Sequence, residues 1–519
     1  GGLALSTLLT GRLDDGTPAP PPTVISVMGW VAAGGVFVLS VLSPTVPIPS
    51  PQPSPEFRGG SKQTRSPQIV GTKRVFHSVL SPQSSVLLLL AALLLELFLA
   101  GRVLPTNNLL PPETFESQRF TVSQLLALNE GQNPPGRVLS ISDGLFDPGD
   151  RAALEARWFD LSPDALQNAF VTVKQRELLA PNLPLMYGIP TIDGFDGGLL
   201  PTAYYTAFTS LLLPDGELRT LDGRLREGMA SPECRGACIP DQRWLSLTNT
   251  RWLLLDKVYD VVHDGVFYDT GIPGGGTLYP NVNDFEATEI RVLYHCADSP
   301  CDTTYVSPRG PDFAPADVLA TLEGGQIIGR LVLDAPSVLE NVSVGNNYAF
   351  TVDAVTLVDA RTGDFQQLAP DGWRRVLSSD VKLYENLWVS PRAFMVYDAV
   401  WTPDTDEGTE TALDLMRDPA FDSRREITLA GAGTNMETSL YDVFYSERSV
   451  DFHRYTAERV VIVVETELDG YLFLSDAYYP GWRATLDGAS VPIYRADVMF
   501  RAVFVPAGTH EVVFTYSPY

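Results

Sequence analysis

The segment GYLFLSDAYYPGWRATLDG, residues 470–488, indicates how the C-terminal part of this chain folds. "GYLFLSDA" alternates in the manner of a β-strand, and "WRATL" begins another strand. Pro480 lacks a donor for strand pairing and Gly481 tolerates a tight backbone, so we expect "YYPG" to form the corner between these strands. Asp487 and Gly488 then predict a type I′ hairpin turn, because both central positions of such a turn need positive φ.

Three aromatic side chains surround this corner. We expect Trp482 to lie over the core of a β-sandwich, because it begins the strand that follows the bend. Tyr478 and Tyr479 are candidate substrate-binding residues, since one of them can face outwards and contact a sugar acceptor or the membrane part. Both can equally be core residues at a strand end that pack against Leu472 and Leu474, and the alternation favours that interpretation.

The chain after residue 101 divides into three parts by its patterns. Short alternating stretches predict a C-terminal antiparallel β domain over residues 379–519, whose last strands would form a meander. Residues 286–378 show the same period between Gly, Pro and Asn, which predicts an inserted β-sandwich module. Residues 102–285 mix helical patterns with short strands and predict an α/β domain. The expected fold class is therefore α+β with β-sandwich regions.

Two apolar runs precede these domains. Residues 24–42 form nineteen residues without a charge, and residues 84–101 form eighteen with a single charge. As helices they would be about 28 Å and about 27 Å long, which matches the hydrocarbon core of a bilayer. We predict that both span a membrane and that residues 1–101 are a transmembrane region. The chain has no initiator Met, so we expect it to be a fragment of a longer protein.

The charges predict the orientation of these spans. Residues 44–83 form a Pro-rich loop of net charge +4, which the positive-inside rule places in the cytoplasm. The whole chain carries −26, so residues 84–519 carry about −29 and are expected to lie outside the cytoplasm. Such an acidic surface repels nucleic acid, which we exclude as a partner.

The four cysteines lie in this acidic part as two close pairs. Cys234 and Cys238 are separated by three residues, and Cys296 and Cys301 by four. We predict two local disulfides, because the exported location favours oxidation. A zinc site built from all four thiolates is the alternative, although the usual C-x-x-C spacing is absent.

The chain carries no catalytic fingerprint for nucleotide binding, hydrolase or metalloprotease chemistry. Two acidic clusters offer oxygen ligands for calcium, but neither has the spacing of an EF-hand, so we interpret them as solvated loops and predict no metal and no cofactor. They consist of Asp193 with Asp196, and of Asp404, Asp406, Glu407 and Glu410.

Two segments closely resemble the C-terminal extracytoplasmic region of the YfhO family of bacterial membrane proteins, which belongs to the GT-C superfamily of glycosyltransferases. They are "VKLYENLWVSPRAFMV" (381–396) and "LSDAYYPGWRATLDGASVPIYRADVMFRAVFVPAGTHEVVFTYSP" (474–518). The resemblance extends to "YGIPTIDGFDG" and "WLSLTNTRWLLLDK", and covers about 84–260 and 379–518. Residues 286–375 depart from it as an insertion.

The resemblance implies a multi-pass membrane glycosyltransferase. Such an enzyme moves a sugar from a polyprenyl-phosphate donor in the membrane lipid to a cell-envelope glycan acceptor, and its soluble domain would cover the site and select the acceptor. The family's catalytic acid lies in a first outer loop that residues 1–83 do not match, so no catalytic residue is assigned. The alternative is a non-catalytic carbohydrate-binding or scaffold protein of the cell envelope.

Overall fold

The structure is a computed structural model, and it is described for most residues from 82 to 518. The described ranges are 82–103, 110–116, 118–142, 144–194, 201–214, 216, 225–230, 234, 237–272, 276–296, 308–309, 318–322, 325–344, 350–439 and 448–518. The chain divides into two compact units, each of which is considered by itself. One contains residues 1–110 and 160–168, and the other contains residues 111–159 and 169–519.

Helix α3 (Pro82–Val103) lies in the first unit. It contains the predicted span 84–101, and its side chains Leu94, Leu97 and Phe98 are each more than half exposed. Within the described ranges, no helix satisfies both the length and the apolarity that a membrane crossing requires. The other predicted span, 24–42, and the loop 44–83 lie outside the described residues. Both spans therefore stay predictions.

A mixed four-stranded sheet forms the α/β part of the second unit. Its order is β1-β2-β14-β13, with β1 parallel to β2 and the other neighbours antiparallel. The strands are β1 (Arg137–Ile141), β2 (Thr250–Leu255), β14 (Lys382–Asn386) and β13 (Trp373–Ser378). The helices described between residues 111 and 249 are α4 (Glu113–Glu116), α5 (Phe120–Asn129), α6 (Arg151–Arg157), α7 (Pro163–Glu177), the 3-10 helix η2 (Leu183–Tyr187), α8 (Ala203–Thr209), α9 (Leu225–Met229) and α10 (Gln242–Leu247). Residues 163–168 of α7 are counted in the first unit.

Apolar residues point to both faces of this sheet. Val138 and Leu254 pack with Val122 and Leu125 of α5 in one core cluster. Leu253 and its neighbours on the opposite face belong to another cluster. Because successive strand residues alternate between faces, a near-continuous apolar run such as the one in β2 fits a strand covered on both sides.

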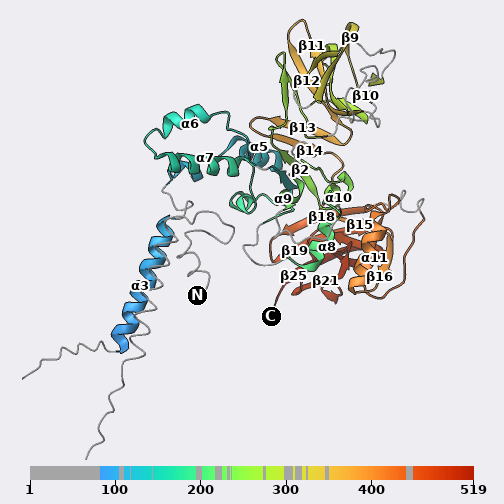
Figure 1. Cartoon of the computed structure of the whole chain (residues 1–519). Helices are drawn as coiled ribbons and strands as arrows, with labels where there is room; N and C mark the ends of the chain where they lie inside the picture. Colours follow the sequence, from blue (N-terminus) through green and yellow to red (C-terminus); the bar gives the residue numbers. More distant parts are fainter. Residues whose placement is uncertain are drawn as a thin grey trace, which may run out of the picture. The chain divides into compact units, whose positions relative to one another are not determined.

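A second sheet is inserted in the chain between β2 and β13, and Figure 1 shows its strands together in green to orange. Its order is β7-β10-β5-β12-β11-β6-β9-β8. The strands are β5 (Gly276–Pro280), β6 (Glu286–Cys296), β7 (Pro308–Arg309), β8 (Val318–Thr321), β9 (Gln326–Val338), β10 (Val342–Val344), β11 (Phe350–Asp359) and β12 (Asp364–Pro370), and a hairpin of β3 (Val261–His263) and β4 (Val266–Tyr268) precedes them.

The inserted sheet runs over 276–370, which differs from the expected module at 286–378. Strand β13 pairs with β14, and β14 pairs with β2, so the hairpin 373–386 belongs to the α/β sheet. The expected boundary between residues 378 and 379 therefore falls inside a hairpin. Alternating patterns locate strands well, but they do not say which sheet a strand joins.

The C-terminal part contains two packed sheets, drawn in orange and red in Figure 1. One has the order β15-β20-β24-β23-β17-β16, and the other β18-β19-β25-β21-β22. The strands are β15 (Ala393–Val396), β16 (Asp398–Thr402), β17 (Glu426–Ala430), β18 (Arg448–Tyr455), β19 (Arg459–Thr466), β20 (Gly470–Leu474), β21 (Trp482–Leu486), β22 (Ala489–Val491), β23 (Tyr494–Ala496), β24 (Phe500–Val505) and β25 (Gly508–Tyr516). Leu472 and Val503 of the first sheet pack with Ile462 and Phe514 of the second.

The expected corner is present, but the expected meander is wrong. Strands β20 and β21 lie in different sheets, so "YYPG" carries the chain from one layer of the sandwich to the other. Strands β24 and β25 are also consecutive and also lie in different sheets. The turn at Asp487 and Gly488 has φ of 50° and 82° and closes the hairpin of β21 and β22, as expected. Strands β16 and β17 are parallel, so the domain is not purely antiparallel.

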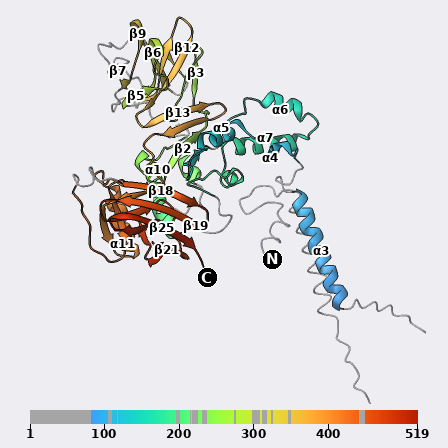
Figure 2. The same ribbon diagram turned by 180° about the vertical axis from the view of Figure 1, so that it is seen from behind.

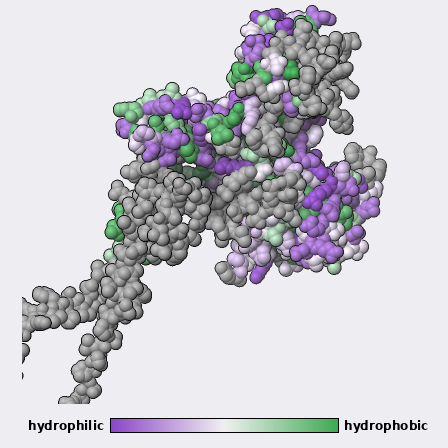
Figure 3. Space-filling view, viewed as in Figure 1, coloured by the Kyte–Doolittle hydropathy of each residue, from purple (hydrophilic) through white to green (hydrophobic). Residues whose placement is uncertain are grey.

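Helix α11 (Asp406–Arg417) packs on β16 and β17 of the first C-terminal sheet, and Figure 2 shows it from behind. The side chain of Thr405 caps it by accepting a hydrogen bond from the amide of Gly408, and Asp406 follows in the first turn, where a carboxylate favours the helix dipole. Its buried residue Leu413 joins the core cluster that also contains Leu253 of β2. Among the coloured residues of the face shown in Figure 3, hydrophilic ones predominate and hydrophobic ones are scattered.

Candidate functional site

The linker of residues 387–392 connects β14 of the α/β sheet with β15 of the sandwich. Its backbone is held from both ends. The amide of Leu387 donates to the carbonyl of Gly372 at 2.8 Å, and the amide of Ser390 donates to the carbonyl of Ser246 at 3.2 Å. These two hydrogen bonds give the linker a defined conformation, and two clefts lie beside it.

Asn386, the last residue of β14, is a main support of this linker. Its Nδ2 donates to Ser246 Oγ and to the carbonyl of Thr250, and its Oδ1 accepts from Gln242 Nε2 and from the amide of Trp388. All hydrogen-bonding positions of the buried Asn386 amide are therefore satisfied, and its bond to the Trp388 amide fixes the backbone of Trp388.

A cleft of about 420 Å³ lies on one side of the linker, and we call it the Trp388 cleft. It is lined by two aromatic side chains and by polar groups of both signs, namely Trp388, Phe421, Asp241, Gln242, Arg243, Ser246, Asp422, Ser423 and Arg424. Trp388 is 47% exposed. A Cβ at Gly372 would lie 2.8 Å from the Trp388 ring, so the glycine leaves space for the indole.

A second cleft of about 340 Å³ lies along the other end of the linker, and we call it the Ser390 cleft. It is lined by the loop between α5 and β1, the start of β2, the linker and β18. The residues are Gln132, Asn133, Pro134, Gly136, Asn249, Arg251, Val389, Ser390, Pro391, Arg392, Ala393, Val450 and Phe452.

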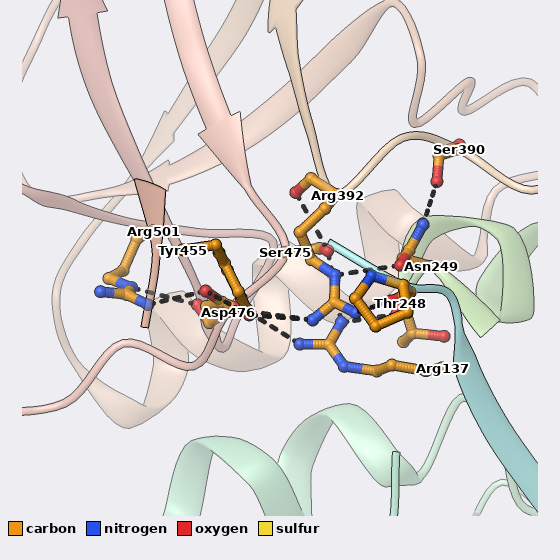
Figure 4. A network of polar contacts seen from close by, with 10 residues as sticks. Arg137, Thr248, Asn249, Ser390, Arg392, Tyr455, Ser475, Asp476 and Arg501 are labelled. Carbon is orange, nitrogen blue, oxygen red and sulfur yellow. Dashed lines mark hydrogen bonds and ion pairs between the residues drawn. The ribbon is translucent and has the colours of Figure 1, made fainter. Parts of the chain in front are cut away.

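Behind the Ser390 cleft, three arginines converge on one carboxylate, as Figure 4 shows. Asp476 lies 2.9 Å from Arg137, 3.4 Å from Arg392 and 3.2 Å from Arg501. The hydroxyl of Tyr455 donates to the same carboxylate at 3.0 Å. We call these five residues the Asp476 cluster.

The Asp476 cluster joins distant parts of the second unit. Arg392 also donates from Nε to Asn249 Oδ1 at 3.0 Å and from Nη2 to the carbonyl of Pro135 at 2.9 Å, and its side chain is 2% exposed. Arg137 donates to the carbonyl of Thr248 at 2.7 Å. Buried charges are tolerated only when they are paired and hydrogen-bonded, and this network provides both.

Both burial and neighbouring charges shift the pKa values in this cluster. Burial raises the pKa of Asp476, but Arg137, Arg501 and Arg392 outweigh it, so the pKa lies below its ordinary value. Burial and the like charge of Arg392 lower the pKa of Arg137 to about 10. Burial also lowers the pKa of Arg501. Asp476 and Arg137 are therefore both charged at neutral pH.

A second buried charge cluster lies at the start of β14. Lys382 Nζ is 2.6 Å from Asp260 and 2.7 Å from Asp269, and Asp269 also binds Arg375 and accepts from the Tyr384 hydroxyl. Burial lowers the pKa of Lys382, but the two carboxylates raise it above its ordinary value. Burial raises the pKa of Asp260 to about 6.

The predicted tyrosines lie outside both clefts. Tyr478 is half-buried, its amide donates to the carbonyl of Met499, and its ring lies 6.4 Å from that of Tyr204. Tyr479 is 50% exposed. Trp482 is partly buried against the sandwich core and lies 5.3 Å from the Tyr516 ring, in the place expected for it. Whether a tyrosine contacts an acceptor stays a prediction.

The other predicted site residues are only partly described. The structure forms the disulfide Cys234–Cys238. Cys296 ends β6, and Cys301 lies outside the described residues, so this second pairing stays a prediction.

Of the acidic clusters, Asp404 pairs with Arg495 at 2.7 Å, and Asp406, Glu407 and Glu410 lie in α11. Burial raises the pKa of Asp193 to about 7, while Asp196 lies outside the described residues. Across the described ranges, no group of His, Cys, Asp or Glu is arranged to hold a metal ion.

Sequence reasoning missed both clefts. Trp388, Ser390 and Arg392 all lie within the segment 381–396 that carries the family resemblance, so a signal was present. Their roles were not visible because the groups that complete each cleft come from α10, β2 and β18.

Comparison with protein-family models matches residues 444–519 to the family described as "Bacterial membrane protein YfhO". The C-terminal portion of this chain therefore belongs to the YfhO family, which confirms the resemblance over these residues. No curated protein matches the chain.

Solved structures of arabinofuranosyltransferase AftD from Mycobacteria are weakly similar. A mutant form is 13% identical over 44% of this chain and 13% of that chain, with a TM-score of 0.15. Another AftD structure is 11% identical over 48% of this chain and 20% of that chain, with a TM-score of 0.13. The chain thus matches only a small part of those proteins, and such TM-scores do not establish a common fold.

Proposed function

We propose that this chain is the C-terminal part of a membrane glycosyltransferase of the GT-C type. The enzyme transfers a sugar from a polyprenyl-phosphate donor, held in the membrane lipid, to a cell-envelope glycan acceptor. The domains from residue 111 onward hold the acceptor, and the Trp388 cleft is its binding site. The C-terminal family match supports the membrane-protein class, and the cleft supports the glycan-binding role.

The lining of the Trp388 cleft carries this proposal. A sugar ring has an apolar face of C–H groups and a rim of hydroxyls. Trp388 supplies a flat, half-exposed indole, and Gln242, Arg243 and Asp422 supply donors and acceptors around it. A few convergent polar groups around an aromatic surface are typical of small-ligand sites. The support of Trp388 by Asn386 and Gly372 keeps the platform in place before a ligand binds.

Membrane attachment is part of the same proposal. Residues 24–42 and 84–101 are the spans, residues 44–83 are cytoplasmic, and the acidic remainder lies outside the cytoplasm. A lipid-linked donor is reached at the bilayer surface, whereas a bulky acceptor is held in water. A soluble domain beside the membrane satisfies both requirements.

Binding to an array of bacterial-envelope oligosaccharides tests the role of the cleft. Residues 1–519 in detergent are expected to bind a subset of these glycans, and Trp388→Ala is expected to weaken that binding by about tenfold or more. Leu387→Ala is the matched control, because Leu387 is 51% exposed beside the cleft but does not line it. Unchanged binding by the Trp388 variant would reject the cleft as the acceptor site.

The alternative function is a non-catalytic carbohydrate-binding or scaffold protein of the cell envelope. The Trp388 cleft fits it equally well. Transfer of sugar from a polyprenyl-phosphate donor by the full-length protein distinguishes the two. Glycan binding that depends on Trp388, without any transfer, would favour the alternative.

A further inference from the structure

We propose that the Ser390 cleft is a separate subsite for an anionic sugar unit, one that carries a carboxylate or a phosphate. The inference rests on the proposed glycan-binding function and adds the charge of the ligand to it. The Ser390 cleft has a volume of about 340 Å³, which lies at the lower end of the range for ligand sites and suits a single small sugar unit.

Hydrogen-bond donors without partners line this cleft. Ser390 is 1% exposed, and its Oγ has no hydrogen-bond partner within the described part of the chain. Arg251 donates from Nε and Nη2 to Glu385, and its Nη1 makes no hydrogen bond to any described residue. A buried hydroxyl left without a partner is unfavourable, and a bound ligand would supply that partner.

The charges around the cleft favour an anion. The carboxylate of Asp476 is shared by three arginines, and that of Glu385 by Arg251 and Arg374. The two ion-pair groups therefore contain five guanidinium groups and two carboxylates. This region therefore has an excess of positive charge, although the whole chain has a net charge of −26. A cleft lined by positive charge concentrates anions at its mouth.

The donor geometry fits a carboxylate or a phosphate better than a neutral sugar. Arginine recognises both groups through parallel N–H donors, and such charge-assisted bonds are stronger than neutral ones. Arg251 is partly exposed at the cleft, whereas Arg137, Arg392 and Arg501 are engaged in the Asp476 cluster. Arg251 therefore offers the accessible donor to a ligand, the Ser390 hydroxyl lies buried in the cleft wall, and the Asp476 cluster supplies the background field.

The test compares anionic and neutral sugars by isothermal titration with residues 1–519 in detergent. The probes are a glucuronate-containing disaccharide, a sugar phosphate, inorganic phosphate and a neutral disaccharide of the same size. At least one anionic sugar is expected to bind about tenfold more tightly than the neutral one, and Arg251→Gln is expected to abolish that preference. The carboxylate and phosphate arms show which anion the cleft prefers.

Arg374→Gln is the matched control, because Arg374 pairs with the same Glu385 but does not line the cleft. Arg374→Gln is expected to keep the preference for the anionic sugar. An equal loss of that preference in Arg251→Gln and Arg374→Gln would overturn the subsite, because the overall charge and not a contact in the cleft would then set the affinity. Ser390→Ala is a second variant, which removes only the hydroxyl. It is expected to weaken the affinity for the anionic sugar several-fold.

Equal affinity for anionic and neutral sugars would overturn the subsite, as would inorganic phosphate binding alone without any sugar preference. Glycan binding that still depends on Trp388 would show that the proposed function survives. A Trp388→Ala variant that binds the neutral glycan more weakly but still prefers the anionic sugar would support two separate clefts.

Discussion

The guanidinium of Arg137 lies 2.9 Å from the carboxylate of Asp476, although the two residues are 339 positions apart in the chain. Arg137 begins β1 of the α/β sheet, and Asp476 follows β20 of the sandwich. The same carboxylate binds Arg392, the last residue of the linker 387–392, and Arg501 of β24. One carboxylate therefore holds together the elements that form the Ser390 cleft.

Asp476→Asn is expected to destabilise the protein by about 3–5 kcal/mol, because it leaves three largely buried guanidinium groups without their counter-charge. Urea denaturation at pH 7 measures the change. Asp451→Asn is the control, since this exposed carboxylate of β18 is expected to matter by less than about 0.5 kcal/mol. Since the pKa of Asp476 is lowered on folding, its contribution is complete above about pH 4 and is lost as the pH falls further. Equal stability of the two variants would contradict the role of the cluster.

Lys382→Met is expected to destabilise the protein strongly at pH 8 and less at pH 5. The substitution removes the cation between Asp260 and Asp269, and breaking such a buried pair costs about 3–5 kcal/mol. At lower pH a proton can replace part of the lost charge, because the pKa of Asp260 is already raised to about 6. Thermal melts at the two pH values measure this. Lys257→Met, at a partly exposed neighbouring lysine, is expected to cost no more than about 1 kcal/mol, and a loss for Lys382→Met that did not vary with pH would argue against the mechanism.

Asp497→Asn is expected to remove a pH dependence of stability. Asp497 is buried, its Oδ1 accepts from the amide and hydroxyl of Thr428, and burial raises its pKa to about 7. Between about pH 4 and this pKa, the unfolded chain has lost the proton and the folded chain retains it, so stability falls as pH rises by up to about 1.4 kcal/mol per unit.

The asparagine retains the acceptor and tolerates the positive φ of 40° at this position. Urea denaturation at pH 5, 6, 7 and 8 compares the two proteins. The wild type is expected to gain stability relative to the variant as the pH falls from 8 to 5. Parallel stability curves would show that Asp497 ionises normally.

Trp482→Ala is expected to destabilise the sandwich by about 3 kcal/mol, at the lower end of the range for buried aromatic residues, because the indole is only partly buried. It loses its contacts with Tyr516 and with the guanidinium of Arg501, which lies 4.0 Å from the ring centroid. Tyr479→Ala, at a side chain that is half exposed, is expected to cost less than about 0.5 kcal/mol. Thermal melts compare the stability of the two variants. A larger loss of stability for Tyr479→Ala would show that Tyr479, and not Trp482, packs on the sandwich core.

Several local features could be predicted from the sequence, because neighbouring residues decide them. The hairpin turn at Asp487 and Gly488 follows from the rarity of positive φ outside Gly, Asn and Asp. The corner at Pro480 and Gly481 follows from the missing amide donor and the flexible glycine. The disulfide Cys234–Cys238 joins residues that are close in the chain.

Sheet membership and the candidate clefts were decided only by the tertiary structure. Alternation with a period of two determines which side chains share a face, but it does not select the partner strand, so β20 and β21 could not be assigned to different sheets. Trp388 and Ser390 become parts of clefts only because α10, β2 and β18 pack beside the linker. The pairing of Arg137 with Asp476 likewise depends on long-range packing, since charges so far apart in the chain carry no local pattern that links them.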